Sequence, residues 1–306
     1  MLYRYPDYYD RFACIADRCE ETCCAGWQIV IDEDALEKFR EKLSGKKDDR
    51  IDWKDGVFCQ SGEKRCAFLN DRNLCDMYIE WGEEYLCETC RRYPRHIEEF
   101  ENIREYTLSL SCPEAAQIIL GNREKVTFIE KEDELEEEDE EFDDLLFSML
   151  ADVREVLYKI LQNRQLSIRQ RILLLLDVTE KCQEKIDEDD IFAINDVIEK
   201  YSHDEKKEPV LEDASNYEKS LARFQMLFQM ELLNDLWADM TDEAAELVYG
   251  GGESVYRKEH HEFETWLAVH YKDYDIILEQ ILVYFISTYF CGAVYDGDMT
   301  GKTQMA

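Results

Sequence analysis

The stretch Cys14-Ile-Ala-Asp-Arg-Cys19-Glu-Glu-Thr-Cys23-Cys24 places four cysteines within eleven residues near the start of the chain. Outward from it the pattern continues, because ten of the twelve cysteines of this 306-residue protein lie in the first 112 residues. Cysteines gathered at short spacing are typical of a metal site or a disulfide framework. We therefore expect the front of the chain to form one cysteine-rich module.

The cellular compartment decides between these two kinds of site. The opening residues contain no unbroken apolar run and no small-residue cleavage site, so no secretion signal is indicated and we expect a cytosolic protein. Thiols stay reduced there, which favours metal ligation over disulfides. Ligation by thiolates without histidine favours zinc or an iron–sulfur cluster. The candidate metal ligands are Cys14, Cys19, Cys23, Cys24, Cys66, Cys75, Cys87 and Cys90.

The eight candidate thiols exceed the four that a tetrahedral zinc or a cubane cluster needs. Either two sites exist or some sulfurs are spare. The Cys87-x2-Cys90 step is the strongest local chelate, because a turn of that length brings two sulfurs onto one ion. We expect Cys182 and Cys291, which lie in helical patterns, to be small buried side chains. Cys59 and Cys112 fit either role.

Charge excludes one class of partner and separates the two halves of the chain. Lys and Arg total 36 against 71 Asp and Glu, a net charge of −35, which disfavours binding to nucleic-acid phosphates. Between Glu130 and Asp144 only three residues are not acidic, so we interpret residues 126–145 as a solvated linker. The longest uncharged run, residues 281–294, is too short to span a membrane and predicts a buried helix.

Local signals predict a mixed α+β fold for the module, residues 1–125. Asp32 can cap a helix that carries Leu36 and Phe39 on one face. Asp55-Gly56 predicts a tight hairpin between residues 51–54 and 57–59, and a second hairpin is expected to join residues 96–100 to 104–110. A proline after Cys112 opens a short helix that ends at Gly121.

Residues 146–306 show helical periodicity and predict an all-α domain. We expect helices at about residues 146–160, 167–186, 190–201, 214–240, 253–270 and 274–292, with aromatic side chains such as Phe228 and Tyr284 in the core. The fold class is therefore mainly α, with a small cysteine-rich α+β metal-binding module before an all-α helical domain. No glycine-rich phosphate loop or zinc-protease motif occurs.

Several motifs resemble those of the flagellin lysine-N-methylase family. The resemblance covers about residues 8–121 and 281–298, and between these it rests only on the helical pattern. The motifs that carry it are Phe12-Ala-Cys14, Cys19-Glu-Glu-Thr-Cys-Cys-Ala-Gly-Trp-Gln-Ile-Val-Ile-Asp32, Cys66-Ala-Phe-Leu69, Leu74-Cys75, Thr89-Cys90, Tyr93-Pro-Arg95, Ser111-Cys-Pro-Glu-Ala-Ala116, Tyr289-Phe290 and Ala293-Val-Tyr-Asp-Gly-Asp298. Members of that family continue past the last motif into further helix, whereas this sequence stops at Ala306.

The resemblance implies an S-adenosylmethionine-dependent lysine N-methyltransferase that acts on flagellin and whose cysteines hold an iron–sulfur cluster. The front motif is also similar to a broader group of zinc- or iron-chelating cysteine domains, so zinc is the alternative metal. We expect the module to form one wall of the donor pocket, with Arg95 as the partner of the donor carboxylate. A structural salt bridge is the other interpretation of Arg95.

A non-enzymatic protein is the alternative to the methyltransferase. In that interpretation the module chelates metal or senses redox state, and the acidic helical half binds a partner. Binding of S-adenosylmethionine separates the two hypotheses, because a pure sensor does not need the methyl donor. The sequence predicts neither a catalytic base nor a membrane or nucleic-acid partner.

Overall fold

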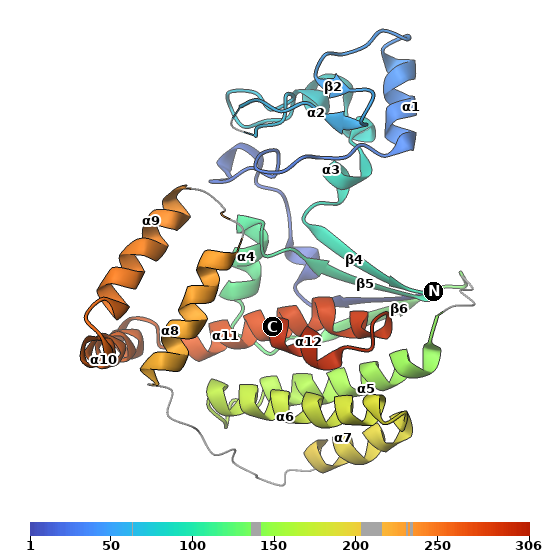
Figure 1. Cartoon of the computed structure of the whole chain (residues 1–306). Helices are drawn as coiled ribbons and strands as arrows, with labels where there is room; N and C mark the ends of the chain where they lie inside the picture. Colours follow the sequence, from blue (N-terminus) through green and yellow to red (C-terminus); the bar gives the residue numbers. More distant parts are fainter. Residues whose placement is uncertain (63, 136–141, 203–215, 231, 233–234) are drawn as a thin grey trace.

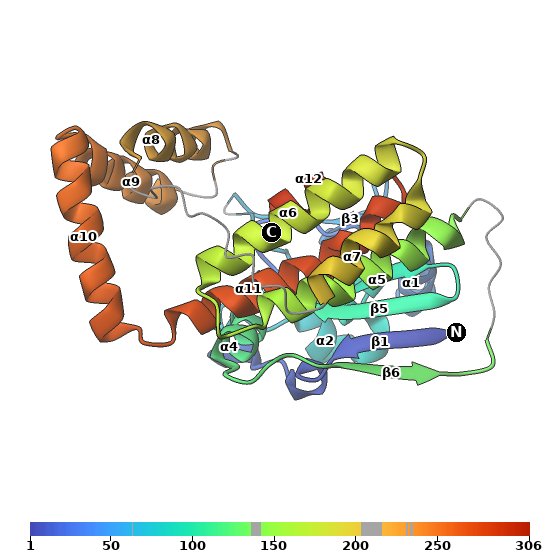
Figure 2. The ribbon, with the colours of Figure 1, turned by 90° about the horizontal axis from the view of Figure 1, so that it is seen from below.

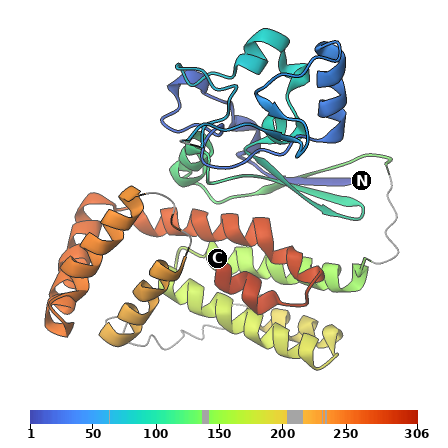
Figure 3. The same ribbon diagram turned by 45° about the horizontal axis from the view of Figure 1, so that its top comes forward.

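The computed structural model describes residues 1–62, 64–135, 142–202, 216–230, 232 and 235–306. It is mainly helical, with 57% helix and 12% strand, as the sequence predicts. Three parts can be distinguished in Figure 1: a cysteine module at the top, a sheet with a helical body below it, and a lobe of three helices at one side. Figure 3 shows the sheet between the module and the helices of the body.

The cysteine module, residues 14–92, has its own small core. It contains α1 (Glu33–Lys42), α2 (Asp76–Trp81), α3 (Glu88–Arg92) and a hairpin of β2 (Ile51–Asp52) with β3 (Val57–Phe58). The predicted cap of α1 is confirmed, because the Asp32 carboxylate accepts a hydrogen bond from the amide of Ala35 at 2.9 Å. Phe39 is completely buried and meets the ring of Trp81 edge-on at 5.6 Å.

The sheet has four strands in the order β4-β5-β1-β6. The predicted hairpin of β4 (Arg95–Phe100) and β5 (Ile103–Leu108) is confirmed. Strand β1 (Leu2–Pro6) lies in the centre, parallel to β5 and antiparallel to β6 (Phe128–Glu132). The stretch interpreted as an acidic linker therefore holds a strand near its start, and its residues 136–141 lie outside the described residues.

The helical body consists of α4 (Pro113–Gly121), α5 (Asp144–Leu161), α6 (Ile168–Asp187), α7 (Ile194–Ser202), α11 (Tyr274–Tyr289) and α12 (Met299–Met305). Its core is continuous with the sheet, since Phe100 and Leu108 from the hairpin pack in one cluster with α5 and α11. One hydrophobic core is built from residues 29–87, and the other from the sheet and the helical body. The two cores are therefore not divided at residue 125, where the sequence predicts the end of the module.

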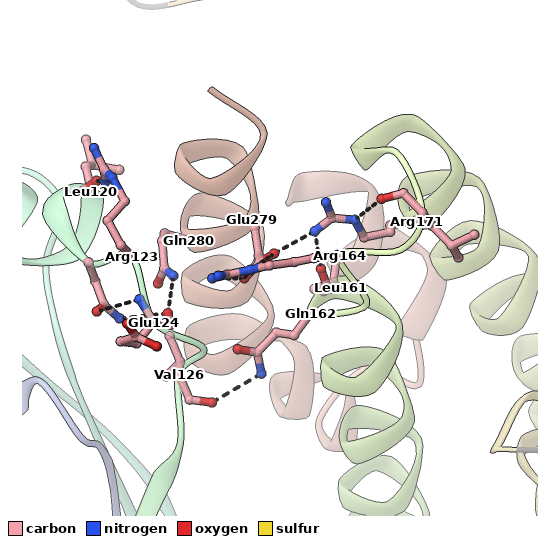
Figure 4. Close-up of polar contacts among 12 residues, drawn as sticks. Leu120, Arg123, Glu124, Val126, Leu161, Gln162, Arg164, Arg171, Glu279 and Gln280 are labelled. Atoms are coloured by element: carbon pink, nitrogen blue, oxygen red, sulfur yellow. Dashed lines mark hydrogen bonds and ion pairs between the residues drawn. The ribbon is translucent and has the colours of Figure 1, made fainter. Parts of the chain in front are cut away.

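Buried ion pairs lock the body together. Glu279 of α11 is fully buried and accepts hydrogen bonds from Arg171 at 2.6 Å and from Arg164 at 2.9 Å. Figure 4 shows Gln280 beside it, donating to the carbonyl of Glu124 at 2.9 Å. Because these contacts come from the α5–α6 turn and the α4–β6 connection, α11 is fixed to both.

A window of α11 and the 3-10 turn after it, Tyr274–Val294, is the one described segment long and apolar enough to cross a membrane by length and composition. In that window 61% is buried inside the protein. The side chains of Val283, Tyr284 and Ile286 lie in the core. The segment therefore serves here as a central helix of the body, as the sequence predicts.

The side lobe consists of α8 (Tyr217–Met226), α9 (Asp235–Ala244) with its π-helical continuation (Ala245–Tyr249), and α10 (Glu253–His270). Figure 2 shows it projecting from the body where α10 leads into α11. The predicted single helix over 214–240 is wrong for its described part, because the chain is extended at Met230. Phe228, expected in the core, is 52% exposed.

Candidate functional site

Backbone hydrogen bonds bring separate cysteine-bearing segments together inside the module. The amide of Cys66 donates to the carbonyl of Cys24 at 2.7 Å, and the chain then turns back so that Leu69 pairs with Cys75. Cys87 lies at the start of α3, with Cys90 on its first turn. Electrostatic interactions connect six thiols of these segments: Cys23, Cys24, Cys66, Cys75, Cys87 and Cys90.

Four of these thiols form two hydrogen-bonded pairs. The hydrogen bond with Cys23 lowers the pKa of Cys24, and the same hydrogen bond raises the pKa of Cys23. The hydrogen bond between Cys87 and Cys90 likewise lowers the pKa of Cys87 and raises the pKa of Cys90. In each pair one thiol therefore has a pKa below its ordinary value, and the thiolate is the form that binds metal.

The other predicted ligands lie at the edge of this cluster. Cys19 interacts electrostatically with Cys14 and Cys23, and also with Cys112, which the sequence left open. Cys14 is exposed, and its sulfur accepts a hydrogen bond from the amide of Ala16 at 3.4 Å. Cys112 precedes α4, far along the chain, so only the long-range fold brings it here.

The remaining cysteines pack in the protein. Cys182 and Cys291 are buried in the helical body, as predicted. Burial raises the pKa of each of these two thiols to about 12. Cys59 is joined through its backbone to Arg50 at 2.9 Å.

The cluster has the donor chemistry of a thiolate-binding metal but is not a closed metal cage. Among the described residues, no group of three or more His, Cys, Asp or Glu side chains has the arrangement of a metal site. The sulfurs lie instead as neighbouring pairs within one region of the module. Zinc and iron–sulfur clusters take sulfur donors of this kind, and the metal stays a prediction from the sequence.

Arg95 lies at the start of β4 on the side of the sheet next to Phe12. Its guanidinium is exposed and lies over the ring of Phe12 at 5.2 Å and that of Tyr9 at 6.0 Å. In the part of the chain that the structure describes, its contacts are aromatic, and no salt bridge joins it to a carboxylate. The alternative interpretation of Arg95 as a structural salt bridge therefore finds no support here.

Two aromatic residues that the sequence analysis did not single out border the cysteines. Trp27 donates from its indole nitrogen to the carbonyl of Cys23 at 3.0 Å, and its ring lies 6.3 Å from that of Tyr93. Burial raises the pKa of Tyr93, which also interacts with Cys19, Cys23 and Cys112. Trp27 lies in the motif from Cys19 to Asp32, and Tyr93, three residues after Cys90, begins the motif that ends at Arg95. These positions are the signal that could have indicated them.

A hollow of about 560 Å³ lies elsewhere, between β6 and the end of α5. Its lining includes Arg4, Phe128, Tyr158 and two lysines, Lys125 and Lys159. The Arg4 guanidinium lies 4.8 Å from the centre of the Phe128 ring and is already paired with Glu155. Because Glu155 balances the positive charge of Arg4, this hollow is less suited to an anionic ligand than its lining residues indicate.

Comparison with known proteins identifies the helical half of the chain. Residues 154–306 match the family described as FliB lysine N-methylase C-terminal domain. That match covers the part of the chain in which the resemblance in the sequence rested mainly on a helical pattern. No solved structure matches the chain.

The names of two curated relatives agree with this family. A lysine-N-methylase of Salmonella typhimurium is 26% identical over 138 residues, which cover 41% of this chain and 34% of the relative. The flagellar biosynthetic protein FliU of Salmonella muenchen is 25% identical over the same share of this chain and 81% of its own length. The chain spans about a third of the length of the first of these relatives. The chain belongs to the FliB lysine N-methylase family, whose C-terminal domain it carries in residues 154–306.

Proposed function

We propose that this protein transfers the methyl group of S-adenosylmethionine to lysine side chains of flagellin in the cytoplasm. The observation that carries the proposal is the match of residues 154–306 to the lysine N-methylase family. The flagellar name of one relative supports the choice of substrate. The rings of Trp27 and Tyr93 beside the cysteine cluster support a binding site for the methyl donor there.

The reaction requires a neutral lysine nitrogen and an aligned methyl donor. The nitrogen lone pair forms a bond to the methyl carbon while the bond from that carbon to sulfur breaks, which leaves a neutral thioether. One proton must leave the nitrogen, and the ordinary lysine pKa near 10.4 opposes this. The negative charge of the protein raises that pKa further, so we expect the lysine to react from an apolar environment that lowers it.

Trp27, Tyr93 and Arg95 would provide the chemistry that such a donor needs. Aromatic ring faces attract a sulfonium cation, and Trp27 and Tyr93 supply two rings next to the cysteines. Arg95 presents an exposed guanidinium that can pair with the donor carboxylate. The same rings exclude water from a lysine nitrogen. These residues would therefore position the reactants rather than exchange protons with them.

The same proposal assigns a metal to the thiols of the module. Cys23, Cys24, Cys66, Cys75, Cys87 and Cys90 would hold an iron–sulfur cluster, or alternatively zinc. When bound, a cluster supplies electron-transfer capacity, and either metal supplies a crosslink between the segments that carry its ligands. The pKa values of Cys24 and Cys87 are lowered, which favours the thiolate form that a metal needs.

The experiment uses protein purified without oxygen and analysed for iron, zinc and inorganic sulfide. It is then incubated with flagellin and a donor labelled in its methyl group. We expect label on lysine, and iron with sulfide in the wild type. Cys90→Ala should lose most of the metal, whereas Cys182→Ala, a cysteine buried in the body, should retain it. Zinc without sulfide would reject the cluster, and absence of label on lysine would reject the enzyme.

Donor binding is tested separately by calorimetry with S-adenosylmethionine. We expect Arg95→Ala to weaken binding about tenfold or more, because it removes a charge-assisted hydrogen bond. Arg40→Ala is the matched control, since Arg40 is an exposed arginine on the far helix α1. Unchanged affinity in Arg95→Ala would contradict the assignment of Arg95.

One observation favours the non-enzymatic alternative. The hydrogen-bonded pairs Cys23–Cys24 and Cys87–Cys90 hold thiols in contact, as a redox-sensing protein would require. In that case oxidation by a mild disulfide reagent would change the fold of the module, and calorimetry would detect no binding of the methyl donor. Binding of the donor at micromolar concentration excludes a pure sensor.

A further inference from the structure

The side lobe exposes an unusual number of large apolar side chains. Helix α9 and its continuation carry a stripe of Leu236, Met240 and Leu247, with exposed fractions of 67%, 56% and 61%. Leu236 and Met240 lie one turn apart on the same face of α9, because four residues at about 100° each return nearly to the same direction, and Leu247 follows in the π-helical segment. Exposed apolar side chains one turn apart are the pattern that receives another helix.

Carboxylates lie on and beside this stripe. The segment from Asp235 to Tyr249 contains five acidic residues and no lysine or arginine. All five are exposed, and in the described part of the lobe none of them pairs with a basic side chain: Asp235, Asp239, Asp242, Glu243 and Glu246. Asp239 lies beside Leu236 and Met240, and Glu243 lies on the same face as Met240, so the surface carries apolar and negative side chains together.

The inner face of the same helix is already used. Thr241 is buried and donates to the carbonyl of Trp237 at 2.6 Å. The rings of Tyr217, Phe224, Tyr249 and Tyr256 form a separate cluster between α8, the π-helical segment and α10, with centroids 5.0 to 6.2 Å apart. The stripe of Leu236, Met240 and Leu247 is therefore not required to form the core of the lobe.

We infer that this stripe is the docking surface for a lysine-bearing amphipathic helix of the protein substrate. The identity of the partner rests on the proposed function, and the chemistry that the partner needs follows from the exposed side chains of the stripe. Apolar residues of the partner would cover Leu236, Met240 and Leu247, and its lysines would lie against the carboxylates. The segment of fifteen residues from Asp235 to Tyr249 is about 22 Å long, so a partner helix of four turns would cover it.

Charge selects this partner over two others. A second copy of the chain, placed symmetrically on the stripe, would bring two rows of carboxylates together, and the protein already carries a net charge of −35. A membrane with anionic headgroups is repelled for the same reason. The methionine at position 240 suits a surface that accepts helices of differing sequence, because its side chain adapts in shape.

The first test measures the binding of a fluorescent 18-residue peptide of leucine and lysine, with leucines at spacings of four, three and four. We expect the peptide to bind at least about tenfold more tightly than a scrambled peptide and than a version with glutamate in place of lysine. Binding should weaken as salt is added. Equal binding of all three peptides would overturn the inference.

Variants test the location of this binding. Leu236→Ser/Met240→Ser should weaken it about tenfold or more, since both side chains lose apolar contact. Phe192→Ser is the matched control, because Phe192 is 64% exposed on the body of the protein. Glu243→Gln/Glu246→Gln should weaken binding and its salt dependence, while Glu37→Gln/Glu41→Gln on α1 removes the same charge without effect. Equal affinity in wild type and stripe variants would refute the docking surface.

The oligomeric state and the methylation assay complete the test. A dimer that dissociates in Leu236→Ser/Met240→Ser would assign the stripe to a second copy and overturn the inference. Because peptide binding is measured without donor, its outcome is independent of catalysis. Lysine-dependent binding without any methyl transfer would reject the proposed function and keep the docking surface. Methyl transfer without stripe-dependent binding would reject the docking surface and keep the proposed function.

Discussion

Replacement of Glu279 by glutamine is expected to destabilise the helical body strongly. The carboxylate has no exposed surface and lies between Arg171 and Arg164 (Figure 4). Glutamine keeps the size of the side chain but removes its charge. Arg171, whose side chain is 3% exposed, would then remain as an uncompensated buried cation. Breaking a buried pair in this way costs about 3–5 kcal/mol.

The two arginines allow the cause to be separated. The side chain of Arg164 is 32% exposed and can reach water after loss of its partner, so Arg164→Gln should cost less than about 1 kcal/mol. Glu279→Leu with Arg171→Met removes both buried charges and should recover a large part of the loss. Recovery will be incomplete, because Arg171 also donates to the carbonyl of Leu161 at 2.7 Å.

Urea denaturation followed by circular dichroism at 222 nm is the appropriate assay. The five tryptophans lie in the cysteine module or the side lobe, at positions 27, 53, 81, 237 and 266, so their fluorescence does not report on the body. The transition midpoint should fall with an unchanged slope. A cost below about 1 kcal/mol for Glu279→Gln, or an equal cost for Arg164→Gln, would refute the reasoning.

Three further predictions concern the cysteine module. The hydrogen bond from Arg50, at 2.8 Å, holds the pKa of Asp48 below its ordinary value. The stability that this pair contributes is therefore present above the ordinary pKa and is lost as the pH falls through the lowered pKa. Asp48→Asn should reduce the free energy of unfolding in urea less at pH 3 than at pH 7. Phe39→Ala should cost about 3–5 kcal/mol, measured by tryptophan fluorescence, because the ring is fully buried; a cost below about 1 kcal/mol would contradict this. If the thiols hold a metal, a strong chelator should shift the tryptophan emission while the circular dichroism at 222 nm changes little. Loss of the metal with unchanged emission would contradict a role of the metal in holding the module together.

Features that depend on neighbouring residues could be predicted from the sequence. The cap at Asp32, the turn at Asp55-Gly56 and the helix that starts at Pro113 all agree with the structure, because each signal lies within the element it starts or ends. The burial of Cys182 and Cys291 followed from their helical setting. The cysteine module was expected from spacing alone.

Features that depend on distant residues could not be predicted in this way. Strand β1 pairs with β5, about a hundred residues away, and nothing in Leu2–Pro6 itself indicates that partner. Strand β6 was hidden because its residues are mostly charged, yet Phe128 packs on Tyr158 at 4.6 Å. Cys112 joins the other cysteines for the same long-range reason. Phe228 on the side lobe was expected in the core but is exposed, because an apolar periodicity does not reveal whether a covering partner belongs to the same chain.

The central place of β1 in the sheet has a consequence for the newly synthesised chain. Leu2–Pro6 leaves the ribosome before the cysteine module, but its neighbours Ile103–Leu108 and Phe128–Glu132 emerge only after the whole module. The module has a separate core built from residues 29–87 and can collapse while β1 is still without a partner. A strand made before the module is thus paired only after it, and its exposed edge must be shielded from other chains in the meantime.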